Sequence, residues 1–152
     1  PLGPIAYIIK ARVTLQRDLG AAVSPFNAFQ TIQGLETLPL RIREHCRNAD
    51  AVTEYLNRHD RVVKVIHPSL QGGEDRVRAD KYLKGGYGGL VGLELKGGLE
   101  AGHEYINALE LFYRVANIGD ARSLAIHPAT TTHSQLTPEE QLATCVTDGY
   151  VR

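Results

Sequence analysis

Between residues 38 and 58, apolar side chains recur at steps of three and four, which is the period of an α-helix. The apolar stripe consists of Leu38, Ile42, Cys46, Ala49, Val52 and Leu56. The opposite side of this predicted helix is rich in arginine and acidic residues, as a solvated face would be. A helix with one apolar stripe needs a second layer to bury it, so the fold of this chain depends on what supplies that layer.

Short segments that are predicted to form β-strands supply this second layer. Residues 62–66 are β-branched, residues 90–95 alternate in polarity, and residues 114–116 and the chain's last residues are further candidates. Helices are expected over residues 76–83, 99–112 and 137–145, and from Ser24-Pro25 to about residue 35. Pro39 is expected to kink or restart the helix there. Helices outnumber strands, which predicts an α+β fold in which a small sheet has helices packed on one face.

The composition is that of a globular domain. A chain of 152 residues suits one domain, and the formal net charge of zero gives no electrostatic reason to expect nucleic acid as a partner. No apolar run approaches the length of a membrane span, so we expect no membrane partner either. Two cysteines do not form a disulfide framework and indicate a reducing, cytoplasmic setting.

We expect residues 1–20 to be a segment leading in from something upstream, and residues 21–152 to form the domain that the resemblance described below identifies as a C-terminal small domain. Residues 1–3 are either native sequence or the scar of a cleaved tag.

The last third of the chain holds the candidate site. Residues 117–136 are dense in hydroxyl groups, contain two histidines and a Gly-Asp turn, and are followed by Arg152. Arginine binds a carboxylate through two parallel hydrogen bonds, and asparagine can add another. We therefore take Arg152 and Asn117 as candidates for binding a small anionic molecule, with solvation of a lone arginine as the alternative.

Other reactive patterns are weaker. The spacing of the histidines matches no metal site, so no metal is expected. Ser123 with His127 or His133 lacks the Gly-x-Ser-x-Gly context of a nucleophile. The glycines between residues 85 and 98 precede a strand rather than a helix, which favours close backbone packing over phosphate binding.

Several segments together resemble one enzyme family. They are residues 18–38, Leu40-Arg41, His45-Cys46, Asn48-Ala49, residues 95–98 and residues 117–136. The chain is similar to the O-acetylhomoserine sulfhydrylases of the pyridoxal-phosphate-dependent Cys/Met metabolism enzymes, from about residue 5 to its end, but only to their C-terminal part. The resemblance implies the small C-terminal domain of fold-type I, aspartate-aminotransferase-like enzymes, with an antiparallel sheet. It also implies a homo-oligomer, specifically a homotetramer, in the full-length protein.

The resemblance further implies a reaction. O-acetylhomoserine and sulfide or a thiol give homocysteine or methionine and acetate, with pyridoxal 5'-phosphate as electron sink. The family's Schiff-base lysine lies in an upstream Ser-x-Thr-Lys segment, and none of Lys10, Lys64, Lys81, Lys84 and Lys96 has that context. We therefore expect the cofactor to be bound by the missing N-terminal part, no catalytic residue in this chain, and no activity of the chain alone.

The resemblance implies two substrate-binding residues. Only Val151-Arg152 is present of the family's Val-Arg-Leu-Ser-Val-Gly motif, whose arginine binds the substrate α-carboxylate. Asn117 holds the family position before an Ile-Gly-Asp turn, near the same carboxylate. Ser123, His127, Thr132 and His133 are expected to support them. The alternatives are a cystathionine γ-synthase or γ-lyase, an O-succinylhomoserine sulfhydrylase, or, in another class, a non-catalytic binding module.

Overall fold

The computed structural model describes residues 3–152, so Pro1 and Leu2 of the segment considered as a cleavage scar lie outside the described residues. Contacts divide the chain into two units, one ending at Pro39 and the other comprising Leu40–Arg152. The predicted boundary between an entry segment of residues 1–20 and a small domain of residues 21–152 stays a prediction.

The first unit is helical. Its elements are η1 (Gly3–Ile5), α1 (Ala6–Lys10), the π-helical turn η2 (Ala11–Gln16), α2 (Arg17–Leu19) and α3 (Pro25–Glu36). The predicted start of α3 is confirmed, because the Ser24 hydroxyl accepts a hydrogen bond from the Asn27 amide at 3.2 Å. Pro39 does restart the helix, since α3 ends at Glu36 and α4 begins at Leu38.

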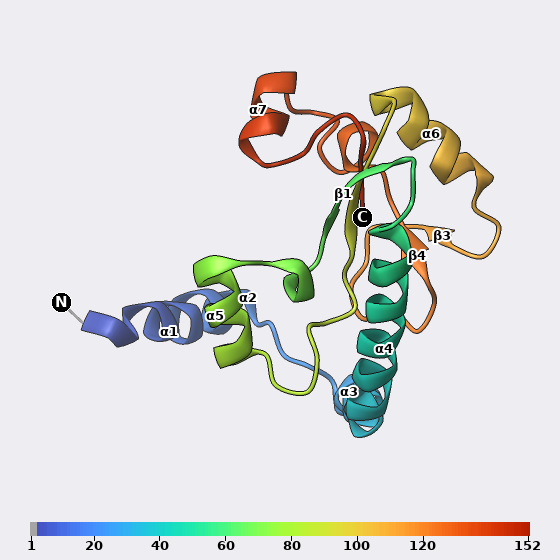
Figure 1. Ribbon diagram of the computed structural model, residues 1–152. Coiled ribbons are helices and arrows are strands. Elements are labelled where there is room, and N and C mark those ends of the chain that lie inside the picture. The colour runs from blue at the N-terminus through green and yellow to red at the C-terminus, as the bar shows by residue number, and fades with distance from the viewer. Residues whose placement is uncertain (1–2) are drawn as a thin grey trace. The chain divides into compact units, whose positions relative to one another are not determined.

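The second unit combines helices with short strands (Figure 1). Its elements are α4 (Leu38–Leu56, which begins in the first unit), β1 (Val62–Ile66), η3 (Pro68–Leu70), α5 (Gly73–Tyr82), β2 (Gly92–Leu95), α6 (Gly98–Ala108), β3 (Tyr113–Arg114), β4 (Leu124–Ala125), η4 (Pro128–Thr130), α7 (Pro138–Ala143) and β5 (Tyr150–Val151). The capping box predicted for α7 is present: the Thr137 hydroxyl accepts from the Glu140 amide, and the Glu140 carboxylate accepts from the Thr137 amide.

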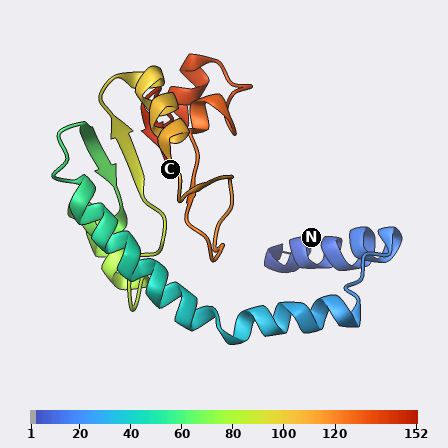
Figure 2. The same cartoon turned by 90° about the vertical axis from the view of Figure 1, so that its right-hand side faces the viewer.

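A three-stranded antiparallel sheet with the order β1-β2-β5 forms the centre of this unit, and the arrows of β1 and β2 lie side by side in Figure 2. Leu93, Leu95 and Val151 are its buried core cluster. The apolar side of α6, with Ala101, Tyr105 and Ile106, packs against this cluster, as does Leu56 of α4. The predicted α+β class with a small antiparallel sheet is therefore confirmed.

The buried side of α4 differs from the predicted stripe. Cys46 and Ala49 are buried as expected, but Ile42 and Val52 are exposed and Thr53 is buried instead. The glycine-rich loop packs on α4 at its buried side, because a Cβ at Gly86 would lie 2.7 Å from the Cys46 sulfur, and one at Gly89 would lie 2.9 Å from the Cβ of His45. The backbone of this loop thus packs directly on α4, which is the close approach that its glycines predict.

Two boundaries were predicted wrongly. The helix expected to reach Phe112 ends at Ala108, because the Arg114 guanidinium donates to the Asn107 carbonyl, the acceptor that a continued helix would need. The strand expected over residues 114–116 is β3, which covers only Tyr113–Arg114 and pairs in parallel with β4. No sequence pattern predicted β4.

The apolar side chains of α3 give the first prediction. Phe26, Phe29, Ile32 and Leu35 are all more than half exposed, so the 152-residue chain should self-associate. Light scattering at high concentration should show oligomers, and Phe26→Glu should reduce their mass. Val77→Glu on α5 is the matched control, because Val77 is 67% exposed and Phe26 is 65% exposed. A monomeric parent chain, or equal effects of both substitutions, would contradict this prediction.

Candidate functional site

Arg152 is held in place by backbone pairing on both sides of β5. On one side, Leu93 of β2 pairs with Val151, and the Leu95 amide donates to the Gly149 carbonyl at 2.9 Å. On the other side, Arg152 and Ile126 exchange two backbone hydrogen bonds of 3.0 Å each. The position of the arginine Cα is therefore fixed by the sheet rather than by its side chain.

The guanidinium of Arg152 lies near the loop that begins at Asn117. Its Nη2 donates to the Asn117 carbonyl oxygen over 3.5 Å, a long contact for a hydrogen bond. This is the one hydrogen bond from the Arg152 side chain found within residues 3–152, so most donors of the guanidinium stay available for a ligand. The predicted neighbourhood of Arg152 and Asn117 is thus present, through a backbone carbonyl rather than through the asparagine amide.

The side chain of Asn117 is turned into its own loop. Its Oδ1 accepts from the Ile118 amide at 3.0 Å, and its Nδ2 donates to Asp120 over 3.5 Å. Asp120 also accepts three hydrogen bonds from the backbone and guanidinium of Arg122. The Arg122 hydrogen bonds lower the pKa of the Asp120 carboxyl well below its usual range. The loop carrying Asn117 is therefore braced internally by charge-assisted hydrogen bonds.

Tyr150 lies on the same side of β5 as Arg152. Partial burial raises the pKa of its phenol, and the positive charge of Arg152 opposes that shift to a smaller extent. A Cβ at Gly92 would lie 2.7 Å from the Tyr150 ring, so the ring rests directly on the backbone of β2. Arg152 therefore stands beside an aromatic side chain in a fixed position.

The four predicted supporting residues are placed differently from one another. His127 is fully buried and hydrogen-bonded to Thr130 and to the Asp148 carbonyl. The Ser123 carbonyl accepts from the Tyr113 amide, and Thr132 bonds the neighbouring His133 ring at 2.9 Å. No hydrogen bond found between Gly3 and Arg152 joins Ser123, Thr132 or His133 to Arg152 or Asn117, and their supporting roles stay predictions.

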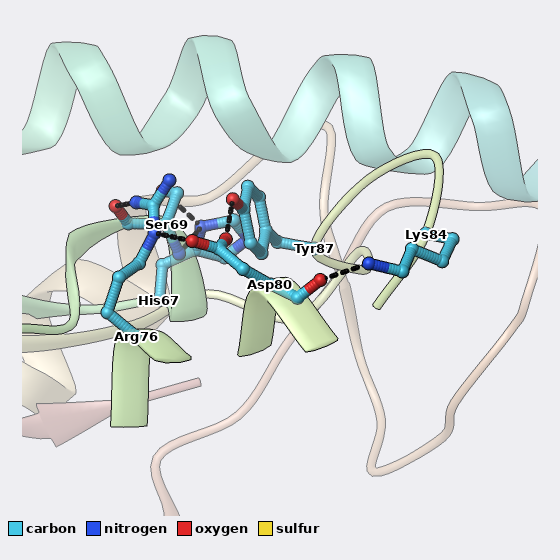
Figure 3. A network of polar contacts seen from close by, with 6 residues as sticks. All are labelled: His67, Ser69, Arg76, Asp80, Lys84 and Tyr87. Atoms are coloured by element: carbon cyan, nitrogen blue, oxygen red, sulfur yellow. Dashed lines mark hydrogen bonds and ion pairs between the residues drawn. The ribbon is translucent and has the colours of Figure 1, made fainter. Parts of the chain in front are cut away.

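A second polar cluster, which the sequence analysis missed, joins α5 to the glycine-rich loop (Figure 3). Asp80 accepts from the Tyr87 hydroxyl at 2.7 Å and from the Arg76 guanidinium at 2.9 Å. Arg76 also donates to the Ser69 carbonyl and stacks over the Tyr87 ring. The Tyr87 hydrogen bond, followed by that of Arg76, lowers the pKa of Asp80.

The only signal of this cluster in the sequence was the i, i+4 pair of Arg76 and Asp80, which is common on solvated helices. Its hydrogen bonds fasten the loop that packs on α4. The Nδ1 of the buried His67 bonds the Ser69 hydroxyl at 2.7 Å, and its Nε2 has no partner among the described residues. We assign the cluster to holding this loop rather than to chemistry.

Other chemical functions find little support in the described residues. All five lysines of the chain are exposed in this structure. No group of three or more histidine, cysteine or acidic side chains able to hold a metal ion is found in residues 3–152. Within the same range, no helix combines the length and apolar character needed to cross a bilayer.

Comparison with known proteins decides the family. The model of the Cys/Met metabolism PLP-dependent enzymes matches residues 6–152. The chain belongs to this family. It is 53% identical over 149 residues to the O-acetyl-L-homoserine sulfhydrylase of Leptospira meyeri. The matched region covers 97% of this chain and 34% of that protein.

Solved structures of the Cys/Met metabolism family agree in fold. A putative O-acetylhomoserine (thiol)-lyase from Campylobacter jejuni, which contains pyridoxyl-lysine phosphate, matches with a TM-score of 0.85 at 40% identity, over 97% of this chain and 35% of that one. Cystathionine γ-synthase from Xanthomonas oryzae matches with a TM-score of 0.79 at 37% identity, over 88% of this chain and 34% of that one. The chain thus spans about a third of the length of these relatives.

The Asp120–Arg122 pair predicts a measurable titration. The Asp120 carboxyl should titrate below the ordinary aspartate pKa of about 3.9, because Arg122 stabilises the ionised form. The stability from this pair is present above about pH 4 and is lost as the pH falls through the folded-state pKa. Carboxyl-carbon NMR should show this low midpoint, and Arg122→Gln should raise it. Arg47→Gln, which disrupts the pair with Glu44, should leave it unchanged. A titration midpoint of Asp120 that is unchanged in Arg122→Gln would refute this assignment.

Proposed function

We propose that this chain is the C-terminal part of a pyridoxal-phosphate-dependent O-acetylhomoserine sulfhydrylase. The whole protein converts O-acetylhomoserine and sulfide, or a thiol, into homocysteine or methionine and acetate. The contribution of this chain is to bind the α-carboxylate of the amino-acid substrate through Arg152. Membership in the Cys/Met metabolism family and the 53% identity to the Leptospira enzyme support the proposal.

The position of Arg152 is the observation that carries the proposal. Its backbone is fixed between β2 and Ile126, while its guanidinium keeps most of its donors available beside the Asn117 loop. A planar guanidinium on a rigid strand can bind both oxygens of a carboxylate at once. Because the strand is held before the ligand arrives, little ordering entropy is lost on binding. The Asn117 loop then limits how the substrate approaches.

The cofactor is assigned to the rest of the protein. When bound, pyridoxal phosphate supplies an electron sink for the loss of the acetyl ester. The residues of this chain do not fit as its covalent anchor, because all five lysines are exposed and lie outside the expected Ser-x-Thr-Lys context. Asn117 and Arg152 fit the substrate acid group instead. We infer that this chain orients the amino acid, and that residues outside it carry out the proton transfers.

The alternatives within the family differ in substrate. Similarity to cystathionine γ-synthase at 37% identity keeps that reaction, the γ-lyase reaction and the O-succinyl ester as second candidates. Asn117, in place of the serine of many cystathionine-processing relatives, favours the sulfhydrylase. A non-catalytic binding module is the candidate of another class, and the presence or absence of an upstream Ser-x-Thr-Lys segment in the gene discriminates it.

The proposal includes the setting of the whole protein. Its partners are a small amino-acid substrate and further copies of itself in a homo-oligomer, for which we propose the homotetramer. We propose a cytoplasmic location, which the two free thiols of Cys46 and Cys145 support.

Substitution of Arg152 tests the function directly. In the full-length protein, Arg152→Ala should raise the KM for O-acetylhomoserine by roughly 10- to 150-fold, because a charge-assisted hydrogen-bonded pair worth about 1.5–3 kcal/mol is lost. Steady-state kinetics with varied substrate measure this change. Arg58→Ala is the matched control, since Arg58 forms an exposed pair with Glu54 on α4. An unchanged KM in Arg152→Ala would remove Arg152 from the site.

The assignment of the cofactor to the rest of the protein gives a further prediction. The 152-residue chain mixed with pyridoxal phosphate should show no specific absorbance band and no defined site of borohydride trapping, because its exposed lysines offer no enclosed site. Mass spectrometry of the reduced mixture locates any adduct. Stoichiometric trapping at a single lysine would contradict the assignment.

A further inference from the structure

The imidazole of His127 is buried at a junction of three segments. The ring is 1% exposed. Its Nε2 is 2.7 Å from the Asp148 carbonyl oxygen, and its Nδ1 is 2.9 Å from the Thr130 hydroxyl. The His103 ring of α6 meets it edge-on at 5.5 Å. This histidine therefore links η4, α6 and the turn that precedes β5.

The direction of these hydrogen bonds follows from the partners. A carbonyl oxygen can only accept, so Nε2 carries the hydrogen and donates it to Asp148. In the neutral ring Nδ1 then carries no hydrogen, and the Thr130 hydroxyl can donate to it. A Cβ at Gly102 would lie 2.5 Å from Nε2, so the backbone of α6 lies directly against the ring.

His127 and its neighbour Ile126 attach to both ends of the segment that carries Arg152. The His127 side chain is bonded to Asp148 at the start of the segment, and the Ile126 backbone is bonded to Arg152 at its end. The two attachments come from adjacent residues of one strand-like stretch. Any shift of this stretch relative to residues 148–152 would have to break them together.

We propose that His127 is a positioning residue for Arg152, setting the register of residues 148–152 so that the guanidinium faces the α-carboxylate of the amino-acid substrate. The inference rests on the proposed function of Arg152 and deepens it. His127 does not touch the substrate, because it is buried and its two ring nitrogens are already bonded. Without the ring, the Asp148 carbonyl would lose its buried donor, and β5 would be held by its backbone pairs and by the packing of Val151 in the core.

The test uses two amide substitutions in the full-length protein. The longer side chain of His127→Gln brings its amide nitrogen near the place of Nε2, where it can donate to Asp148. The shorter side chain of His127→Asn is polar too, but cannot reach that carbonyl. Both variants are made with Arg152 intact and with Arg152→Ala, and KM and kcat are measured for O-acetylhomoserine. Hydrogen exchange of the Arg152 amide supplies a readout that is independent of turnover.

In the intact background, His127→Asn should raise KM about three- to tenfold, the effect of losing one hydrogen bond, with kcat changed by less than about twofold. His127→Gln should stay within about twofold of the parent protein in both constants. In the Arg152→Ala background, His127→Asn should add no further increase in KM, because the two residues act in series. The Arg152 amide should exchange faster in His127→Asn than in His127→Gln.

The contradicting results are separable. Three results would overturn the positioning role. His127→Asn could raise KM by the same factor with and without Arg152, the two amide variants could raise KM equally, or His127→Asn could leave KM unchanged. If Arg152→Ala itself leaves KM unchanged, the proposed function fails and this inference fails with it.

If His127→Asn does not fold, Thr130→Val replaces it, because it removes the bond to Nδ1 from an exposed position. A KM raised about two- to threefold then supports the role, and an unchanged KM overturns it.

Discussion

The two-sided pairing of the last strand is the constraint on which the candidate site depends. β5 is short, and a strand of two residues has little stability alone. It lies between β2 and the Ile126–His127 stretch, so each of its edges is occupied by backbone hydrogen bonds. Val151 points into the apolar core, whereas Tyr150 and Arg152 share the opposite side. Core packing and the proposed ligand binding thus use alternate residues of one strand.

This arrangement fits a domain that supplies binding rather than the bond-breaking step. The described residues hold a positive charge in a fixed place, and a loop stiffened by Asp120 and Arg122 lies beside it. They contain no enclosed lysine and no metal-binding group. Enzymes separate these tasks when remote binding energy orients a substrate at a reacting centre built elsewhere. A chain that spans about a third of its relatives agrees with such a division.

Local sequence patterns predicted the parts of the fold that local physics determines. The caps at Ser24 and Thr137 follow from a hydroxyl next to a proline, and β1 follows from a run of β-branched residues. The end of α6 and the position of β4 depend on partners distant in sequence, such as Arg114 binding Asn107. The buried side of α4 also involves distant partners, because a glycine-rich loop about 40 residues away packs on His45 and Cys46.

The candidate site was also predicted only in part from the sequence. The chemistry of the last third of the chain and a resemblance to known motifs both singled out Arg152 and Asn117, and the structure places them near each other. Spacing alone could not reveal that the side-chain amide of Asn117 donates to Asp120, while the backbone carbonyl of Asn117 accepts from Arg152. Nor could it show that His127 reaches Asp148, 21 residues further along the chain. Such contacts arise from the crossing of segments, which periodicity does not encode.

A crystal structure of the full-length protein with bound O-acetylhomoserine would test the central claim most directly, through the distances between the Arg152 guanidinium and the substrate carboxylate. The account predicts two parallel N–H···O contacts of about 2.7–2.9 Å, with Ile126 still paired to Arg152. A substrate acid group bound by other residues, with the Arg152 side chain directed into solvent, would contradict it.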